Sequence, residues 1–133
     1  MTLPATLNVL VLDDEPAIRD SISYFLEDFG IKVYTAESIE KAHKILGAVP
    51  VEVAIVDLRL TGSSGEDFIL ASLHAYPSVK YIIHTGLNDY QLHETLAAHP
   101  NVSRTIFQKP LQEMEELYLE VLRMADEDRS IEG

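Results

Sequence analysis

Five strand-like stretches recur along the chain, and an amphipathic segment follows each of them. The stretches predict strands over 9–12, 31–35, 53–56, 79–84 and 105–107. Between and after them, apolar residues recur every three or four positions, which is the helical period. This spacing predicts helices over 16–29, 39–46, 65–75, 88–98 and 111–124. Regular alternation of this kind is typical of a parallel sheet with helices on both faces.

The hydrophobic pattern also suggests the order of the strands. Residues 9–12 and 53–56 are continuously apolar, as expected of strands buried on both faces, whereas residues 31–35 alternate and fit an edge. We therefore predict an α/β fold, a flavodoxin-like doubly wound five-stranded parallel sheet of order 2-1-3-4-5 with five flanking helices. In that order the switch point, where ligands bind, lies between the first and third strands.

Capping residues support these boundaries. Pro16 suits the first turn of a helix, and Gly30 suits the position just past a helix end. Ser38 and Asn88 are expected to cap the second and fourth helices.

Composition narrows the possible functions. The 133 residues fit one domain, and no apolar run approaches the length of a membrane span. The absence of cysteine excludes a disulfide scaffold and is compatible with a cytoplasmic location, which we expect. A net charge of −12 argues against direct nucleic-acid binding; it favours basic partner surfaces or bound cations, or serves only solubility.

Residues whose side chains can react or bind a ligand stand where predicted strands end. They are Asp13, Asp14, Asp57, Thr85 and Lys109. Each has an ordinary explanation as a helix cap or loop residue. Because the carboxyl ends of parallel strands share one edge, however, the five are expected to converge on one crevice.

The chemistry of this set points to phosphoryl transfer. Three carboxylates repel one another by roughly 4 kcal/mol per pair at 4 Å, so a cation is expected among them. Hard oxygen ligands suit Mg²⁺. An aspartate can attack phosphorus, and Asp57 is the best candidate because it stands apart from the Asp13–Asp14 pair. Lys109 and Thr85 are expected to contact phosphoryl oxygens.

With these residues in place, the chain resembles the receiver domain of two-component response regulators. The resemblance extends to about Met124 and rests on motifs that occur in the family's order. They are Asp13–Asp14, Asp57, Gly65, Thr85–Gly86 and Lys109–Pro110.

The resemblance implies a role for each matching position. Asp57 is implied to accept a phosphoryl group from a sensor histidine kinase or a histidine phosphotransfer protein. The implied Mg²⁺ ligands are Asp14 directly, Asp13 mostly through water, Asp57, and the backbone carbonyl of Arg59. Thr85 is implied to swing toward the phosphoryl group.

Lys109 is implied to pair with the phosphoryl group, and its bond to Pro110 is commonly cis in the family. The resemblance implies a switch rather than an enzyme, limited to self-phosphorylation from donors and autodephosphorylation.

Two positions depart from the family pattern. Ile106 stands where an aromatic residue usually reports the threonine movement, and Phe107 is its neighbour. Thr61 stands where the loop after the phosphoacceptor often has proline.

Two other functions remain open. A degenerate receiver would bind partners without being phosphorylated, and Ile106 mildly favours it. A metal-dependent phosphatase usually has an acid two positions after its nucleophile, where this chain has Arg59, which cannot serve as one.

The output is expected to pass through protein contacts on the face of the fourth helix, fifth strand and fifth helix. Leu117 and Leu119 fall off the apolar stripe of the last helix and suggest a partner or homodimer surface. Residues 1–125 are expected to form the receiver and 126–133 a short polar tail or the start of a linker, in a stand-alone protein or one domain of a longer regulator.

Two neighbours of the motifs receive lesser roles. Glu15 is expected to favour the first turn of the following helix. His84 is expected to enter a helix–sheet layer or line the edge of the site.

Overall fold

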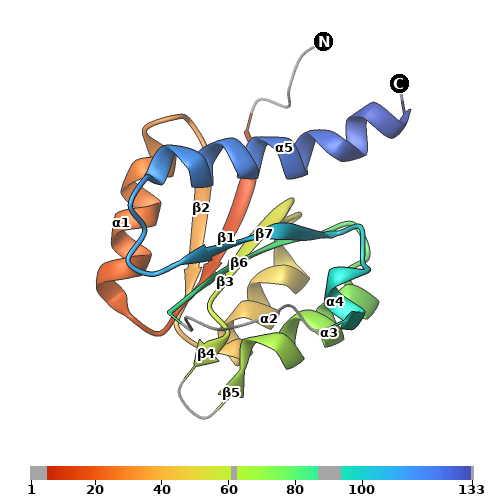
Figure 1. Ribbon diagram of the computed structural model, residues 1–133, viewed down its shortest axis with the longest axis horizontal. Coiled ribbons are helices and arrows are strands. Elements are labelled where there is room, and N and C mark those ends of the chain that lie inside the picture. The colour runs from red at the N-terminus through yellow and green to blue at the C-terminus, as the bar shows by residue number, and fades with distance from the viewer. Residues whose placement is uncertain (1–5, 61–62, 87–93, 133) are drawn as a thin grey trace.

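The computed structural model describes residues 6–60, 63–86 and 94–132, and its centre is a five-stranded parallel sheet (Figure 1). The strands are β1 (Asn8–Leu12), β2 (Lys32–Ala36), β3 (Val53–Val56), β6 (Lys80–Thr85) and β7 (Val102–Gln108). Their order is β2-β1-β3-β6-β7, which confirms the predicted 2-1-3-4-5 order. The two continuously apolar strands, β1 and β3, are paired in the middle, and β2 lies at an edge.

Helices cover both faces of this sheet (Figure 1). They are α1 (Pro16–Glu27), α2 (Ile39–Ala48), α3 (Gly65–Ala75), α4 (Glu94–Ala97) and α5 (Met114–Glu132). On one face α1 and α5 pack over Val9, Val11 and Ile55, and on the other α2, α3 and α4 pack over Leu10, Leu12 and Val56. The alternation of side chains along each strand therefore supplies two separate cores.

Local signals explain where several helices begin and end. Pro16 opens α1, and the oxygen of Ser38 accepts a hydrogen bond from the amide of Lys41, as expected of a cap. Ser64 caps α3 in the same way. Gly30 has φ +82°, a left-handed conformation that glycine adopts without strain. The predicted cap at Asn88 lies outside the described residues.

The loop after Asp57 and the last helix differ from the expectation. The loop after Asp57 contains two short antiparallel strands, β4 (Arg59–Leu60) and β5 (Ser63–Ser64). Helix α5 begins at Met114 rather than at residue 111 and continues to Glu132, beyond residue 124. Among the described helices, none combines the length and apolar character that a membrane span requires.

Strand β7 is longer than the predicted strand because it contains a bulge. The pairing passes from Tyr81–Val102 to Ile83–Ile106, so residue 82 of β6 faces residues 103–105 of β7. The buried Ser103 side chain accepts a hydrogen bond from the amide of Thr105 and donates one to Glu120 of α5. The extra residues are therefore held in place by side-chain hydrogen bonds, a device that the sequence pattern did not reveal.

Candidate functional site

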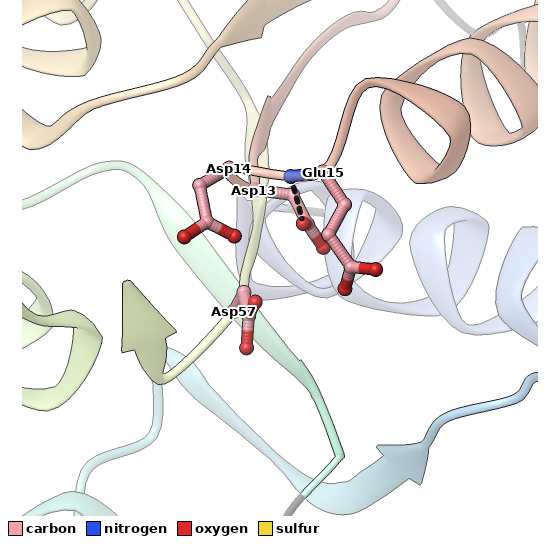
Figure 2. Close-up of side chains that lie close together, drawn as sticks. All are labelled: Asp13, Asp14, Glu15 and Asp57. Atoms are coloured by element: carbon pink, nitrogen blue, oxygen red, sulfur yellow. Dashed lines mark hydrogen bonds between the residues drawn. The ribbon is translucent and has the colours of Figure 1, made fainter. Parts of the chain in front are cut away.

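Four acidic side chains meet where β1 and β3 end. Asp13, Asp14 and Glu15 follow β1, and Asp57 follows β3, its pairing partner. One carboxylate oxygen from each lies within 4.8 Å of the others (Figure 2). Parallel pairing of two buried strands places these residues side by side, as the sequence predicted.

One cation lies among these acids. The ammonium nitrogen of Lys109 is 2.8 Å from Oδ2 of Asp13, 2.9 Å from Oε1 of Glu15 and 3.0 Å from Oδ2 of Asp57. An ammonium group has three N–H donors, so these three acceptors occupy all of them. Lys109 thus joins the end of β7 to the ends of β1 and β3.

Backbone contacts fix the two buried aspartates. Oδ1 of Asp13 accepts a hydrogen bond from the amide of Glu15 at 2.9 Å (dashed in Figure 2), and Oδ1 of Asp57 accepts one from the amide of Arg59 at 3.1 Å. The guanidinium of Arg19 donates to the carbonyl oxygen of Asp13 at 2.7 Å. Both carboxylates therefore have defined orientations before any ligand binds.

The electrostatics reflect burial of charge. Burial raises the pKa of Asp13, and the hydrogen bond from Lys109 offsets this only in part. Burial opposes the charge of Lys109, but its hydrogen bonds to Asp13, Glu15 and Asp57 outweigh that effect and raise its pKa. The site thus holds a cation firmly and carries excess negative charge.

Thr85 and Lys109 complete the strand ends. Thr85 is fully buried as the last residue of β6, and its carbonyl accepts a hydrogen bond from the amide of Lys109 at 2.9 Å. The Lys109–Pro110 peptide bond is cis, as expected. Beside them, a cavity of about 340 Å³ opens to solvent, and its lining includes Asp14, Asp57 and Lys109.

Gly65 is required by a close backbone approach. A Cβ atom at this position would lie 2.2 Å from the carbonyl oxygen of Asp57 and 2.7 Å from Cα of Leu58. The start of α3 therefore packs directly against the segment that carries Asp57, which explains glycine eight positions after it.

Each predicted site residue has a place in this arrangement. Asp13, Asp14 and Asp57 form the acidic cluster with Glu15, and Arg59 lines the cavity. The oxygen-rich, partly buried and net-negative donor set fits Mg²⁺, which prefers carboxylate and carbonyl oxygens.

The structure corrects the prediction for Glu15. Its side chain was expected to favour the first turn of α1, but it binds Lys109, a residue 94 positions away. Arg19 was also missed, because its contact is with a backbone carbonyl that no sequence motif marks.

A second correction concerns the last helix. Leu117 was expected to contribute to a partner surface, but its side chain is fully buried under α1 and the sheet. Leu119 is 56% exposed, so its side chain is accessible to a partner. The packing of α5 decides which of its faces is buried. The helical period of the sequence did not predict that face accurately enough to place Leu117 inside it.

The structure shows whether Phe107 can replace the aromatic residue that is expected at position 106. Ile106 packs against the core beneath α2, α3 and α4, whereas Phe107 belongs to the core beneath α1 and α5. Adjacent strand residues point to opposite faces, so Phe107 does not take the place of an aromatic side chain at 106.

Comparison with known proteins agrees with this geometry. Residues 9–121 match the family described as "Response regulator receiver domain". The transcriptional regulatory protein AruR of Pseudomonas aeruginosa is 35% identical over 86 residues, which make up 61% of this chain and 35% of AruR. The chain thus spans about a third of the length of that relative.

Two solved structures have the same fold. The response regulator TrrA of Thermotoga maritima, solved with Mg²⁺ and BeF, has a TM-score of 0.76 at 24% identity, covering 89% of this chain and 98% of that one. The beryllofluoride-activated NtrC4 receiver domain dimer has a TM-score of 0.76 at 26% identity, covering 90% and 97%.

The fold and the acidic site are those of a signalling module. The chain belongs to the response regulator receiver domain family. Receiver domains generally act as signalling modules that interact with histidine kinases or phosphotransfer proteins, bind Mg²⁺ at an acidic pocket and can dimerise.

Proposed function

We propose that this receiver domain is a phosphorylation-dependent switch whose phosphoacceptor is Asp57. The observation that carries the proposal is the ion pair between Lys109 and Asp57, which joins a buried carboxylate to a cation at the edge of an open cavity. A buried aspartate held by one lysine and one amide is positioned to receive a phosphoryl group and to have its charge compensated afterward.

The transfer itself balances simply. An oxygen of Asp57 attacks the phosphorus of a phosphohistidine on a partner kinase or phosphotransfer protein. The P–N bond breaks, its electron pair stays on the histidine nitrogen, and that nitrogen takes up a proton. Lys109 compensates the charge on the phosphoryl oxygens, and the Thr85 hydroxyl moves to bind one of them.

The residues that would hold Mg²⁺ are Asp14 directly, Asp13 through water, Asp57, and the carbonyl of Arg59. When bound, the ion would neutralise charge on the phosphoryl oxygens. The partly buried, negatively charged oxygen cluster supports this assignment, and the backbone contacts to Asp13 and Asp57 fix the orientation of their carboxylates.

The test is incubation with a small phosphodonor, with and without Mg²⁺, followed by intact-protein mass spectrometry. We expect one added phosphoryl group that requires Mg²⁺. It should disappear in Asp57→Asn and persist in Asp28→Asn, a control at the exposed end of α1. No adduct under these conditions would favour the degenerate receiver, and turnover of an unrelated phosphoester would favour the phosphatase.

The output surface that we propose is the face formed by α4, β7 and α5. It holds a shallow pocket of about 320 Å³ that Phe107, Leu119 and Arg123 help to line. An exposed leucine beside charged side chains suits a protein partner or a second copy of the chain.

A further inference from the structure

His84 is a buried polar residue next to the site that the proposed mechanism does not use. Its side chain lies in β6 and the residue is 2% exposed. Neither ring nitrogen has a hydrogen-bond partner among the residues that the structure describes. Buried polar groups nearly always have partners, so a buried ring with two unpartnered nitrogens calls for one.

The sheet places His84 beside Asp57, on the face that α1 and α5 cover. The ladder between β3 and β6 ends with the pair Val56–Ile83, so Asp57 and His84 follow at the next step. On its other side His84 pairs with Phe107 of β7. Paired residues point to the same face, so the imidazole lies on the side of Phe107 and the α1–α5 core.

The charge of Lys109 reaches this ring. Burial and, after it, the nearby Lys109 ammonium lower the pKa of His84 to about 4, although the carboxylates of Asp13 and Glu15 act to raise it. At neutral pH the ring is therefore uncharged and has one N–H donor and one free lone pair. A lone pair near an ammonium group is a ready acceptor.

The hydrogen-bond donors of the Lys109 ammonium need acceptors in both states of the site. All three N–H groups are bound to carboxylates, and the side chain is only 13% exposed. In the phosphorylated state, Asp57 is expected to carry the phosphoryl group, and the Asp13 oxygens are expected to accept hydrogen bonds from water bound to Mg²⁺. Glu15 and one phosphoryl oxygen then remain for three donors, which leaves one donor without an acceptor.

We propose that His84 is a positioning residue for Lys109, whose ammonium donates to the His84 imidazole when Asp13 and Asp57 bind Mg²⁺ and the phosphoryl group. This inference rests on the proposed phosphorylation at Asp57. It gives the unprotonated ring nitrogen a partner, because the site in its phosphorylated state supplies the donor that this nitrogen lacks.

Thermal unfolding with Mg²⁺ and beryllofluoride, as a phosphoryl mimic, tests the inference. His84→Met removes the acceptor but keeps an apolar side chain of similar size. We expect its apparent affinity for beryllofluoride at saturating Mg²⁺ to fall about tenfold, as for the loss of one hydrogen bond to a charged group. His84→Asn or His84→Gln, which keep an acceptor, should restore most of that affinity.

A matched control lies on the same strand. Tyr81→Phe removes a buried hydroxyl from the opposite face of β6 and should leave the beryllofluoride affinity unchanged. The inference is overturned if His84→Met binds beryllofluoride as tightly as the wild type. It is equally overturned if affinity falls but neither amide variant recovers it, since the ring would then act only by packing.

Nitrogen NMR of the histidine ring adds a direct readout. On addition of Mg²⁺ and beryllofluoride, the unprotonated nitrogen of His84 should move upfield as it accepts a hydrogen bond, and an unchanged signal contradicts the proposal. Failure of the underlying function is distinguishable: the wild type would then show no Mg²⁺-dependent stabilisation, or Asp57→Asn would show the same stabilisation.

Discussion

The ammonium of Lys109 lies 3.0 Å from the Oδ2 atom of Asp57, although the two residues are 52 positions apart. The same ammonium contacts Asp13 and Glu15, so one side chain compensates three carboxylates from two strand ends. The Lys109–Asp57 ion pair therefore sets how the site responds when one of its charges is removed.

Removing Lys109 should destabilise the metal-free protein. In Lys109→Met the buried carboxylates of Asp13 and Asp57 lose their cation, and we expect the free energy of unfolding at pH 7 to fall by about 3 kcal/mol. Because the pKa of Lys109 is raised by folding, its contribution is present throughout the neutral range and is lost only in strong alkali.

Urea unfolding with EDTA measures this effect, and added Mg²⁺ should restore part of the loss. Lys41→Met is the control, since Lys41 pairs with Glu37 on the surface at 3.5 Å and should change stability by under about 0.5 kcal/mol. Equal effects of the two substitutions would contradict the prediction.

Neutralising Asp13 should have the opposite effect. Its pKa is raised by burial, so the folded state favours the protonated form, and stability from this group falls as pH rises above its ordinary value of 3.8. Asp13→Asn should therefore increase the unfolding free energy without metal by about 1 kcal/mol at pH 7.

Urea unfolding in EDTA measures the change in unfolding free energy, with Asp20→Asn on the exposed side of α1 as the control. A less stable Asp13→Asn protein would show that the ionised carboxylate is net favourable.

Gly65 should tolerate no side chain. In Gly65→Ala the new Cβ would meet the backbone of Asp57 and Leu58, which cannot move without shifting the Asp57 carboxylate. We expect a loss of more than about 2 kcal/mol and a parallel loss of Mg²⁺ affinity. Gly47→Ala is the control: its Cβ meets only the Tyr76 hydroxyl at 3.8 Å, and in the helix α2 alanine should stabilise by about 0.5–1 kcal/mol. Calorimetry of both variants checks the contrast, and equal outcomes would contradict it.

His84 should make the protein sensitive to mild acid. Its pKa is about 4 in the folded chain and 6.5 in its ordinary state, so between these values the unfolded chain binds the proton more readily. Stability from this group is therefore full above pH 6.5 and falls as pH decreases toward 4, by about 3 kcal/mol in total. The measurement is the difference in unfolding free energy between the wild type and His84→Gln across this range. A difference that stays constant across this pH range would contradict the lowered pKa of His84 in the folded chain.

Leu119 should contribute to association, whereas Leu117 should not. Leu119→Ser is expected to weaken any dimer that forms with Mg²⁺ and beryllofluoride by about tenfold while leaving the fold intact, because Leu119 is 56% exposed. Size-exclusion chromatography with light scattering measures it. Leu117→Ala should instead lower the unfolding free energy by about 3 kcal/mol, because Leu117 is fully buried. A chain that stays monomeric with the phosphoryl mimic would contradict the proposed dimer surface.

Much of the fold was predictable because its signals are local. The runs at 9–12 and 53–56 are apolar at every position, so they had to be central strands, and both lie in the middle of the sheet. The acids that follow them converge because parallel strands end at the same edge. Ser38 and Gly30 acted as expected because capping depends on a residue and its nearest neighbours.

The sequence by itself therefore determined the order of elements, the strand order and the edge at which Asp13, Asp57 and Lys109 meet. Only the tertiary structure decided that Glu15 binds Lys109, that Leu117 is buried, and that β7 carries a bulge held by Ser103. The physical reason is the range of the interactions. A period of two or 3.6 residues records which side of an element is apolar, but the partner of a side chain depends on how elements distant in sequence pack together.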